Sequence, residues 1–151
     1  MNSGYGSALQ PWQYIATSSQ KPLTWLGSYT LNGYFYSDSG YGDTFTKESS
    51  VRIPSQTPVF GDGQWVDAWP EPTDPPPPSL YTDNDSPPGT ITRFCIARHG
   101  NAPPNPPSSH GALLMGGINM YFIDGHSQLV QLESLWNQYW NTDWTPRATP
   151  P

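Results

Sequence analysis

The residues of this chain that could do chemistry are few and stand far apart. His99 and Asp124 are the first pair to consider, because a histidine beside a carboxylate can serve in acid–base catalysis or hold a metal ion. If residues 90–99 and 118–123 form neighbouring antiparallel strands, about six residues at roughly 3.3 Å each place the two side chains roughly 20 Å apart. We therefore expect no joint site. His99 should secure the end of a loop, and Asp124-Gly125 should form a tight turn with positive φ angles.

Nucleophilic catalysis has little support in the sequence. Cys95 lies between Phe94 and Ile96, where a cysteine is typically a small buried apolar residue and not a reactive thiolate. The sequence has no Gly-x-Ser-x-Gly, His-Glu-x-x-His or phosphate-binding glycine motif. A hydrolase would need His99 or His110 within hydrogen-bond distance of a serine or an aspartate. We expect that the chain is not an enzyme.

Aspartates near predicted turns are the candidate ligands for a cofactor. Calcium prefers several carboxylate and carbonyl oxygens, and the candidate ligands are Asp62, Asp67, Asp83 and Asp85. Residues 81–85, Tyr-Thr-Asp-Asn-Asp, begin like a calcium loop but lack the glycine and the terminal glutamate at EF-hand spacing. Solvated turn carboxylates explain these residues more simply. Calcium is therefore a hypothesis, and no other cofactor is implied.

Composition predicts one domain with a small core. Of the 151 residues, 34% are hydrophobic, below the roughly 45–50% of ordinary domains, and 19 are proline. The formal charge is −6 and the six Lys and Arg are scattered, so a nucleic-acid surface has no electrostatic basis. The chain as given has neither a run of about 18 apolar residues nor a basic-then-apolar leader, so it is expected to be soluble.

Local patterns predict an α+β fold with an antiparallel sheet and long Pro-rich loops. Residues 118–123 and 126–130 surround Asp124-Gly125 and predict a β-hairpin, in which His126 is a cross-strand partner. Apolar residues then recur at 132, 135, 136 and 139, which predicts an amphipathic helix over 132–140 packed across the sheet. Residues 90–99 are expected to form a central strand, because both of their faces carry apolar side chains.

The rest of the chain divides into three parts. In residues 1–27 we expect no long helix or strand, because Pro11 and Pro22 interrupt the apolar residues of this segment. Residues 28–145 are the globular part, with further extended segments around Tyr29–Tyr36 and Thr57–Phe60. Residues 146–151 form a Pro-containing tail.

Four blocks, taken in order, resemble the globular part of prepilin-type proteins of Planctomycetes and Verrucomicrobia. The blocks are GSYTLNGYFYS, PVFGDGQWVDAWPEPTDPPPPSLYT, RFCIARHG and GGINMYFIDGHSQLVQLESLWNQYWNTDW. Those proteins are similar to type II secretion pseudopilins and type IV pilins. The resemblance implies an antiparallel-sheet head on an N-terminal hydrophobic helix, which prepilin peptidase cleaves and methylates and which packs into a filament core.

The resemblance also implies a function and partners. The chain would be the soluble head of a structural subunit of a filament or a secretion pseudopilus, with other pilin or pseudopilin subunits as partners. The full-length form would be anchored in the inner membrane before assembly, and the head would lie outside the cytoplasm. The hydrophobic helix is absent here, so residues 1–27 are interpreted as a remnant of the stalk.

The family's signature is a histidine nine residues before an Asp-Gly pair. Here His99 stands further upstream of Asp124-Gly125, with NAPPNPPSSHGALLM inserted between them. His110 is a second candidate for the signature histidine, but its spacing from Asp124-Gly125 also differs from that of the family.

The aromatic residues support an alternative function. The chain has seven Trp and nine Tyr, and exposed planar rings can stack on sugars, so a secreted carbohydrate-binding module is the alternative. Most of these rings should nevertheless fill the interior, because few aliphatic side chains are available. The expected core tryptophans are Trp25, Trp65, Trp69, Trp136 and Trp140.

Overall fold

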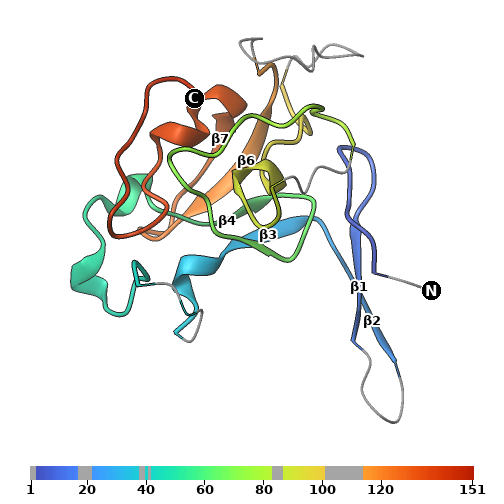
Figure 1. Ribbon diagram of the computed structural model, residues 1–151, viewed down its shortest axis with the longest axis horizontal. Helices are drawn as coiled ribbons and strands as arrows, with labels where there is room; N and C mark the ends of the chain where they lie inside the picture. Colours follow the sequence, from blue (N-terminus) through green and yellow to red (C-terminus); the bar gives the residue numbers. More distant parts are fainter. Residues whose placement is uncertain (1–2, 17–21, 38–39, 41, 83–86, 101–113) are drawn as a thin grey trace.

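The computed structural model describes residues 3–16, 22–37, 40, 42–82, 87–100 and 114–151. Two β-sheets, mainly antiparallel, are connected by loops and short helices, so the fold is α+β with mostly β structure (Figure 1). The larger sheet has five strands in the order β5-β3-β4-β6-β7. Its strands are β3 (Tyr29–Asn32), β4 (Pro58–Asp62), β5 (Asp67–Ala68), β6 (Gly117–Phe122) and β7 (Ser127–Gln131).

The described helices are all short 3-10 helices. They are η1 (Gly33–Phe35), η2 (Glu48–Ser50), η3 (Pro54–Gln56), η4 (Ile91–Arg93) and η5 (Leu132–Asn137). None of the helices within the described residues is long and apolar enough to cross a membrane.

The hairpin predicted near the C-terminus is present as β6 and β7. The strands pair antiparallel, with Asn119 opposite Leu129. In the turn between them only Gly125 has a positive φ angle, 95°, so the expectation of positive φ at Asp124 was wrong. One glycine is sufficient for this turn, because the Asp124 side chain accepts a hydrogen bond from the backbone N–H of His126 at 3.2 Å.

The smaller sheet forms an arm of two antiparallel strands, β1 (Trp12–Ala16) and β2 (Leu23–Gly27), that stands away from the body (Figure 1). The sequence predicted no long element here, and that prediction was wrong. Pro11 and Pro22 do not interrupt the strands; each lies one residue before a strand begins. A proline there removes no N–H from the ladder.

The core lies on one face of the five-stranded sheet. Ile118, Met120 and Phe122 of β6 point to this face and are at most 1% exposed. Trp136 and Trp140 pack in the same cluster, as expected, and their indole N–H groups donate to the carbonyls of Asp74 at 3.0 Å and Leu135 at 2.8 Å. Buried indoles are therefore tolerated because loop carbonyls accept their hydrogen bonds.

Three of the tryptophans expected in the core lie elsewhere. Trp25 is 57% exposed on the arm, so its assignment to the core was wrong. Trp65 and Trp69 are half-buried. Their places in the core are taken by Trp144 and by aliphatic side chains of residues 91–97.

The central strand predicted over residues 90–99 is not formed. Residues 91–93 are the helix η4, and the Thr90 side chain caps it by accepting a hydrogen bond from the Thr92 N–H at 3.4 Å. The segment is nevertheless buried, and its polar backbone is satisfied from other loops; Gln64 Nε2 donates to the Thr92 carbonyl at 2.9 Å. Apolar residues on both faces indicated burial correctly, but they do not distinguish a buried strand from a buried irregular segment.

The amphipathic α-helix predicted over residues 132–140 is also not formed. Only Leu132–Asn137 are helical, as η5, and Gln138 is extended with ψ 164°. Leu132, Leu135 and Trp136 are buried as the spacing predicted. The carbonyls of Leu135 and Trp136 accept from the Trp140 and Trp144 indoles, so the chain folds back on itself after one short helix.

Candidate functional site

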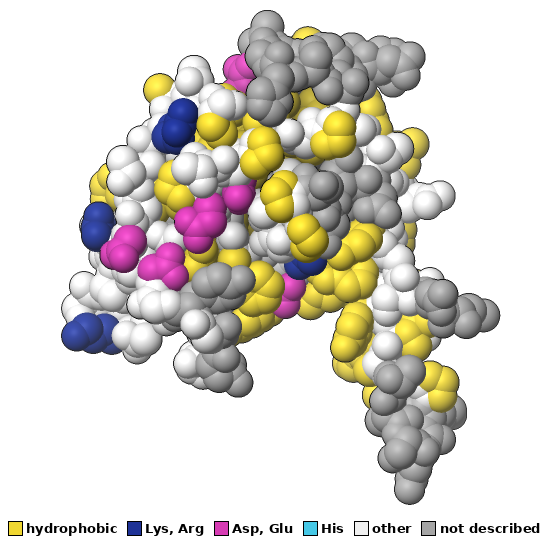
Figure 2. All heavy atoms as spheres, viewed as in Figure 1, with side chains coloured by type: hydrophobic (Ala, Val, Ile, Leu, Met, Phe, Trp, Pro, Cys, Tyr) yellow, Lys and Arg dark blue, Asp and Glu magenta, His cyan; other side chains and the backbone are white. Residues whose placement is uncertain are grey.

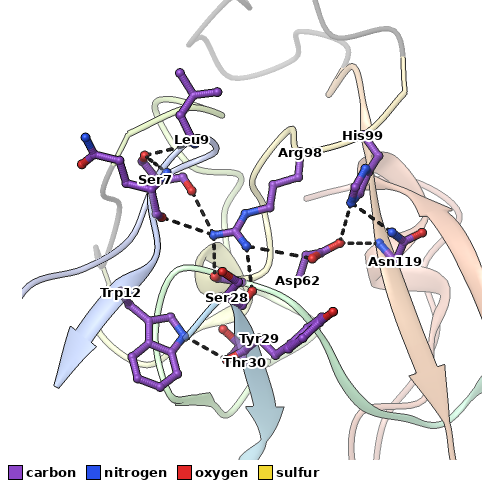
Figure 3. Close-up of polar contacts among 12 residues, drawn as sticks. Ser7, Leu9, Trp12, Ser28, Tyr29, Thr30, Asp62, Arg98, His99 and Asn119 are labelled. Atoms are coloured by element: carbon purple, nitrogen blue, oxygen red, sulfur yellow. Dashed lines mark hydrogen bonds and ion pairs between the residues drawn. The ribbon is translucent and has the colours of Figure 1, made fainter. Parts of the chain in front are cut away.

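A polar cluster on the open face of the larger sheet contains two of the residues singled out in the sequence, His99 and Asp62. The polar cluster consists of Asp62 at the end of β4, Asn119 of β6, and Arg98 and His99 (Figure 3). The His99 Nε2 atom lies 3.1 Å from Asp62 Oδ2 and 3.0 Å from Asn119 Nδ2. The Asn119 backbone N–H donates to the same Asp62 oxygen at 2.8 Å. The buried carboxylate of Asp62 thus connects two strands and the loop that carries His99.

Arg98 and Asn119 are the two residues of this cluster that the sequence analysis missed, and Arg98 has the larger number of contacts. Arg98 is the first of them to consider. Its guanidinium donates to the carbonyls of Ser28 at 2.8 Å, Ser7 at 3.0 Å and Gly63 at 3.2 Å, and Nη1 lies 3.9 Å from Asp62 Oδ1. Burial lowers the pKa of Arg98, and the nearby Asp62 charge opposes that shift. An arginine within an apolar run was the available signal, because such a charge needs buried partners.

Two backbone hydrogen bonds join His99 and Gly117 in an antiparallel bridge next to the polar cluster. The His99 N–H donates to the Gly117 carbonyl at 3.0 Å, and the Gly117 N–H donates to the His99 carbonyl at 2.7 Å. Gly100 and Gly116 follow and precede this bridge with φ angles of 81° and 101°. A Cβ on Gly100 would lie 3.5 Å from the Cα of Gly116. The chain therefore leaves and re-enters the sheet at neighbouring points.

His99 and Asp124 do not meet, as expected, and each has its own partner. Asp124 Oδ1 lies 2.6 Å from His126 Nδ1, and this bond lowers the pKa of Asp124. The His126 ring stacks on Phe122 at 4.5 Å between ring centres. Both side chains of the Asp124–His126 pair are partly exposed, which indicates a turn-stabilising contact.

Two of the calcium candidates are paired with arginines. Asp62 faces Arg98, and Asp67 Oδ1 lies 3.2 Å from Arg93 Nη1, which also donates to the Asp67 carbonyl at 2.6 Å. Asp83 and Asp85 lie outside the described residues, as does His110. Within the described part of the chain no three His, Cys, Asp or Glu side chains gather in a way that could hold a metal ion.

The His99–Asp62 contact of 3.1 Å meets the distance condition stated above for a hydrolase. Among the described residues the His99 ring bonds to Asp62 and Asn119, a carboxylate and an amide. Cys95 is fully buried, and burial raises the pKa of its thiol. The arrangement connects β4, β6 and the loop that carries His99, whose side chain is 43% exposed.

The open face of the larger sheet carries a row of aromatic rings. The Tyr29 ring lies 5.7 Å from that of Phe60 in an edge-on arrangement, and Phe60 stacks on Tyr121 at 5.1 Å. Tyr29 is 57% exposed, and Leu31 of β3 and Leu129 of β7, on the same face, are 40% and 46% exposed. We call this surface the aromatic sheet face.

A second apolar surface lies between the arm and the body. Trp12, Tyr14 and Trp25 of the arm and Val66 of the body line a shallow cleft of about 300 Å³ with few polar atoms. Trp12 is fixed there, because its Nε1 donates to the Tyr29 carbonyl at 3.0 Å (Figure 3).

Comparisons with family models, with curated proteins and with solved structures find no match for this chain.

Proposed function

We propose that this chain is the soluble head domain of a pilin-like or pseudopilin subunit, a structural component of a filament or a type II secretion pseudopilus. The observation that carries the proposal is the aromatic sheet face. One face of the five-stranded sheet packs on the core, whereas the other exposes Tyr29, Leu31 and Leu129. An apolar helix, as the family resemblance implies, would cover these side chains and remove their apolar area from water.

The His99–Gly117 bridge supports the family resemblance. The chain leaves this bridge at Gly100 and returns to it at Gly116, so residues 101–115 can be treated as an insertion. Without them, Gly100 and residues 116–123 separate His99 from Asp124-Gly125, so His99 would stand ten residues before Asp124. That differs by one residue from the spacing of the family signature.

The proposal places the head outside the cytoplasm, on a subunit that is anchored in the inner membrane before it assembles with other subunits. Its function is to pack and to present loops, without transforming a substrate. Calcium stays a proposal that now depends on Asp83 and Asp85, because Asp62 and Asp67 are paired with arginines.

The test is performed in the source cells with an antibody against this chain. We expect the wild-type protein in the envelope fraction and in filaments sheared from the surface. Leu31→Lys should abolish assembly, because it places a charge on the aromatic sheet face, while the purified variant chain keeps its melting temperature within about 2 °C. Ser49→Lys, an exposed position in η2, is the matched control and should assemble normally.

Two outcomes would contradict this function. One is wild-type protein confined to the cytosolic fraction. The other is Leu31→Lys protein that assembles as well as the Ser49→Lys control.

The alternative, a carbohydrate-binding module, is favoured by one observation, the exposed aromatic side chains of the arm. Tyr14 and Trp25 are 43% and 57% exposed and line the cleft beside Val66. Rings of this kind can stack on sugars, but a sugar also needs hydrogen-bonding groups for its hydroxyls, and the cleft has few. A protein surface is therefore the better match for this cleft.

A further inference from the structure

The outer edge of β1 is covered by the N-terminal segment. Gly4 and Gln13 exchange two backbone hydrogen bonds of 2.8 Å, and the Ile15 N–H donates to Ser3 Oγ at 3.0 Å. The backbone groups of Gln13 and Ile15 therefore point away from β2. In an antiparallel pair of strands, two opposite residues either exchange two backbone hydrogen bonds with each other, or both point their N–H and C=O groups away from each other. Gln13 and Ile15 belong to the second kind of pair.

The outer edge of β2 is open as a consequence. Leu26 lies opposite Gln13 and Thr24 lies opposite Ile15, so the N–H and C=O groups of Leu26 and Thr24 also point away from the partner strand. Both residues are exposed, and these four backbone groups have no hydrogen-bond partner among the described residues. The edge thus presents an alternating row of donors and acceptors to solvent.

We propose that this edge pairs with the same edge of a second copy of the chain. Two β2 strands lie antiparallel across a two-fold axis and form a four-stranded sheet in the order β1-β2-β2-β1. Thr24 of each copy lies opposite Leu26 of the other, and each such pair exchanges two N–H···O=C bonds. The pairing uses the arm alone and does not depend on the pilin-like assignment.

The proposed register places Trp25 on the two-fold axis. Trp25 lies opposite Tyr14 within one chain, so its backbone points inward and its ring lies on the aromatic side of the arm. Across the axis, Trp25 would meet Trp25 of the second copy in a non-hydrogen-bonded pair, with Cα atoms about 4.5 Å apart. Aromatic pairs at such positions each stabilise a sheet by roughly 0.2–1 kcal/mol.

The surface of the arm fits a second copy of the same chain. An isolated two-stranded ribbon is marginal in water, whereas four strands with an apolar face are not. Leu23, Trp25 and Leu26 are 55%, 57% and 66% exposed. With their neighbours they could bury on the order of 1,000 Å² in total, the lower limit of a specific interface. We therefore expect a dimer with a dissociation constant in the micromolar range.

Charge also favours a second copy over a charged partner. The chain has a net charge of −6, so two copies repel each other over most of their surfaces. Residues 3–16 and 22–27 contain no charged residue, and Figure 2 shows no Lys, Arg, Asp or Glu on this part of the arm. Two copies can approach there with little electrostatic cost.

The first test measures the association state of the whole chain. Sedimentation equilibrium over about 1–500 μM should show a monomer–dimer equilibrium. Leu26→Pro removes the outward N–H and should weaken the dimer at least tenfold, while Leu26→Ala keeps the N–H and should weaken it less. A chain that stays monomeric throughout this range would overturn the proposal, and so would a dimer that Leu26→Pro leaves intact.

The second test checks the register. Trp25→Cys should form an intermolecular disulfide under mild oxidation, because its Cα atoms lie within bonding range. Thr24→Cys is the matched control; in this register its two Cα atoms are roughly 8 Å apart, beyond disulfide reach. Cys95 is buried and does not interfere. Crosslinking of Thr24→Cys but not of Trp25→Cys would overturn the register.

Discussion

The backbones of His99 and Gly117 exchange hydrogen bonds of 3.0 Å and 2.7 Å across an excursion of the chain. Gly100 and Gly116 lie next to this bridge, both with positive φ angles. A two-residue hairpin of type I′ requires positive φ at both central residues, for which Gly-Gly is favoured. We therefore expect that a chain joined directly from Gly100 to Gly116 still folds.

The deletion of residues 101–115 has a measurable cost. It removes Leu114, which is 5% exposed in the core cluster, and truncating such a residue costs about 2–5 kcal/mol. Leu114→Ala in the full chain is the matched control. Urea unfolding should give similar losses for both variants. A deletion variant that fails to fold, while Leu114→Ala folds, would show that the excursion is not an insertion.

Arg98 should be the most sensitive polar residue of the candidate site. Arg98→Ala leaves the Ser7, Ser28 and Gly63 carbonyls and the Asp62 carboxylate without this donor. Removing one partner of a buried charge network costs about 3–5 kcal/mol, which urea unfolding would measure. Arg98→Lys keeps the charge but not the fork of donors, so it should recover only part of that stability. Equal stability of the wild type and Arg98→Ala would show that these contacts of Arg98 do not stabilise the fold.

Asp74 should make stability depend on pH. Burial raises the pKa of Asp74, and hydrogen bonds from the backbone of Ile91 and Glu71 oppose the shift. A raised carboxyl pKa contributes stability that is present below the unfolded value of 3.8 and lost as pH rises through the folded value. Asp74→Asn should therefore gain stability relative to the wild type as pH rises from about 3 to 7.

The pH experiment has a matched control. Ser49→Ala replaces an exposed side chain that carries no titratable group, so the difference in unfolding free energy between Ser49→Ala and the wild type should stay constant over the same range. A constant difference for Asp74→Asn as well would argue against a cost of ionising the buried carboxyl.

The sequence predicted local pairing better than buried irregular structure. The hairpin β6–β7 was predictable because alternation, turn chemistry and register all arise within fifteen neighbouring residues, 117–131. Residues 90–99 and 132–140 were assigned to the wrong elements, although their buried side chains were largely identified. Hydrophobic periodicity indicates which side chains are buried, but the backbone conformation of both segments depends on carbonyls and indoles from distant loops.

In the candidate site, too, only the features that depend on neighbouring residues were predictable from the sequence. His99 was expected to hold a loop end, and the structure places it in the bridge to Gly117. Its partners Asp62 and Asn119 come from strands distant in sequence, so no local spacing could reveal them. Arg98 was overlooked because the segment was interpreted as a central strand with apolar residues on both faces, whereas the Arg98 side chain is 10% exposed and bonded to the N-terminal segment.

Cys95 should be inert in the folded protein. Its side chain is fully buried, and burial raises the pKa of the thiol, so the reactive thiolate is scarce. Ellman's reagent at pH 8 should therefore label Cys95 only as fast as the protein opens, and at once in denaturant. Labelling of the native protein at the rate of a free thiol would mean that the core around Phe94 and Ile96 is open to solvent.

The cleft beside the arm distinguishes the structural function from the carbohydrate-binding alternative. Trp12, Tyr14 and Trp25 line it with few polar atoms, so it offers stacking surfaces but few groups for sugar hydroxyls. We expect a glycan array to show no saturable binding. We also expect sugars at about 10 mM to leave tryptophan fluorescence unchanged, since unpaired hydroxyls oppose entry into such a cleft. Saturable glycan binding that Trp25→Ala abolishes, and that the control Ser49→Lys retains, would favour the alternative function. The comparison is direct because both positions are exposed, and only Trp25 lines the cleft.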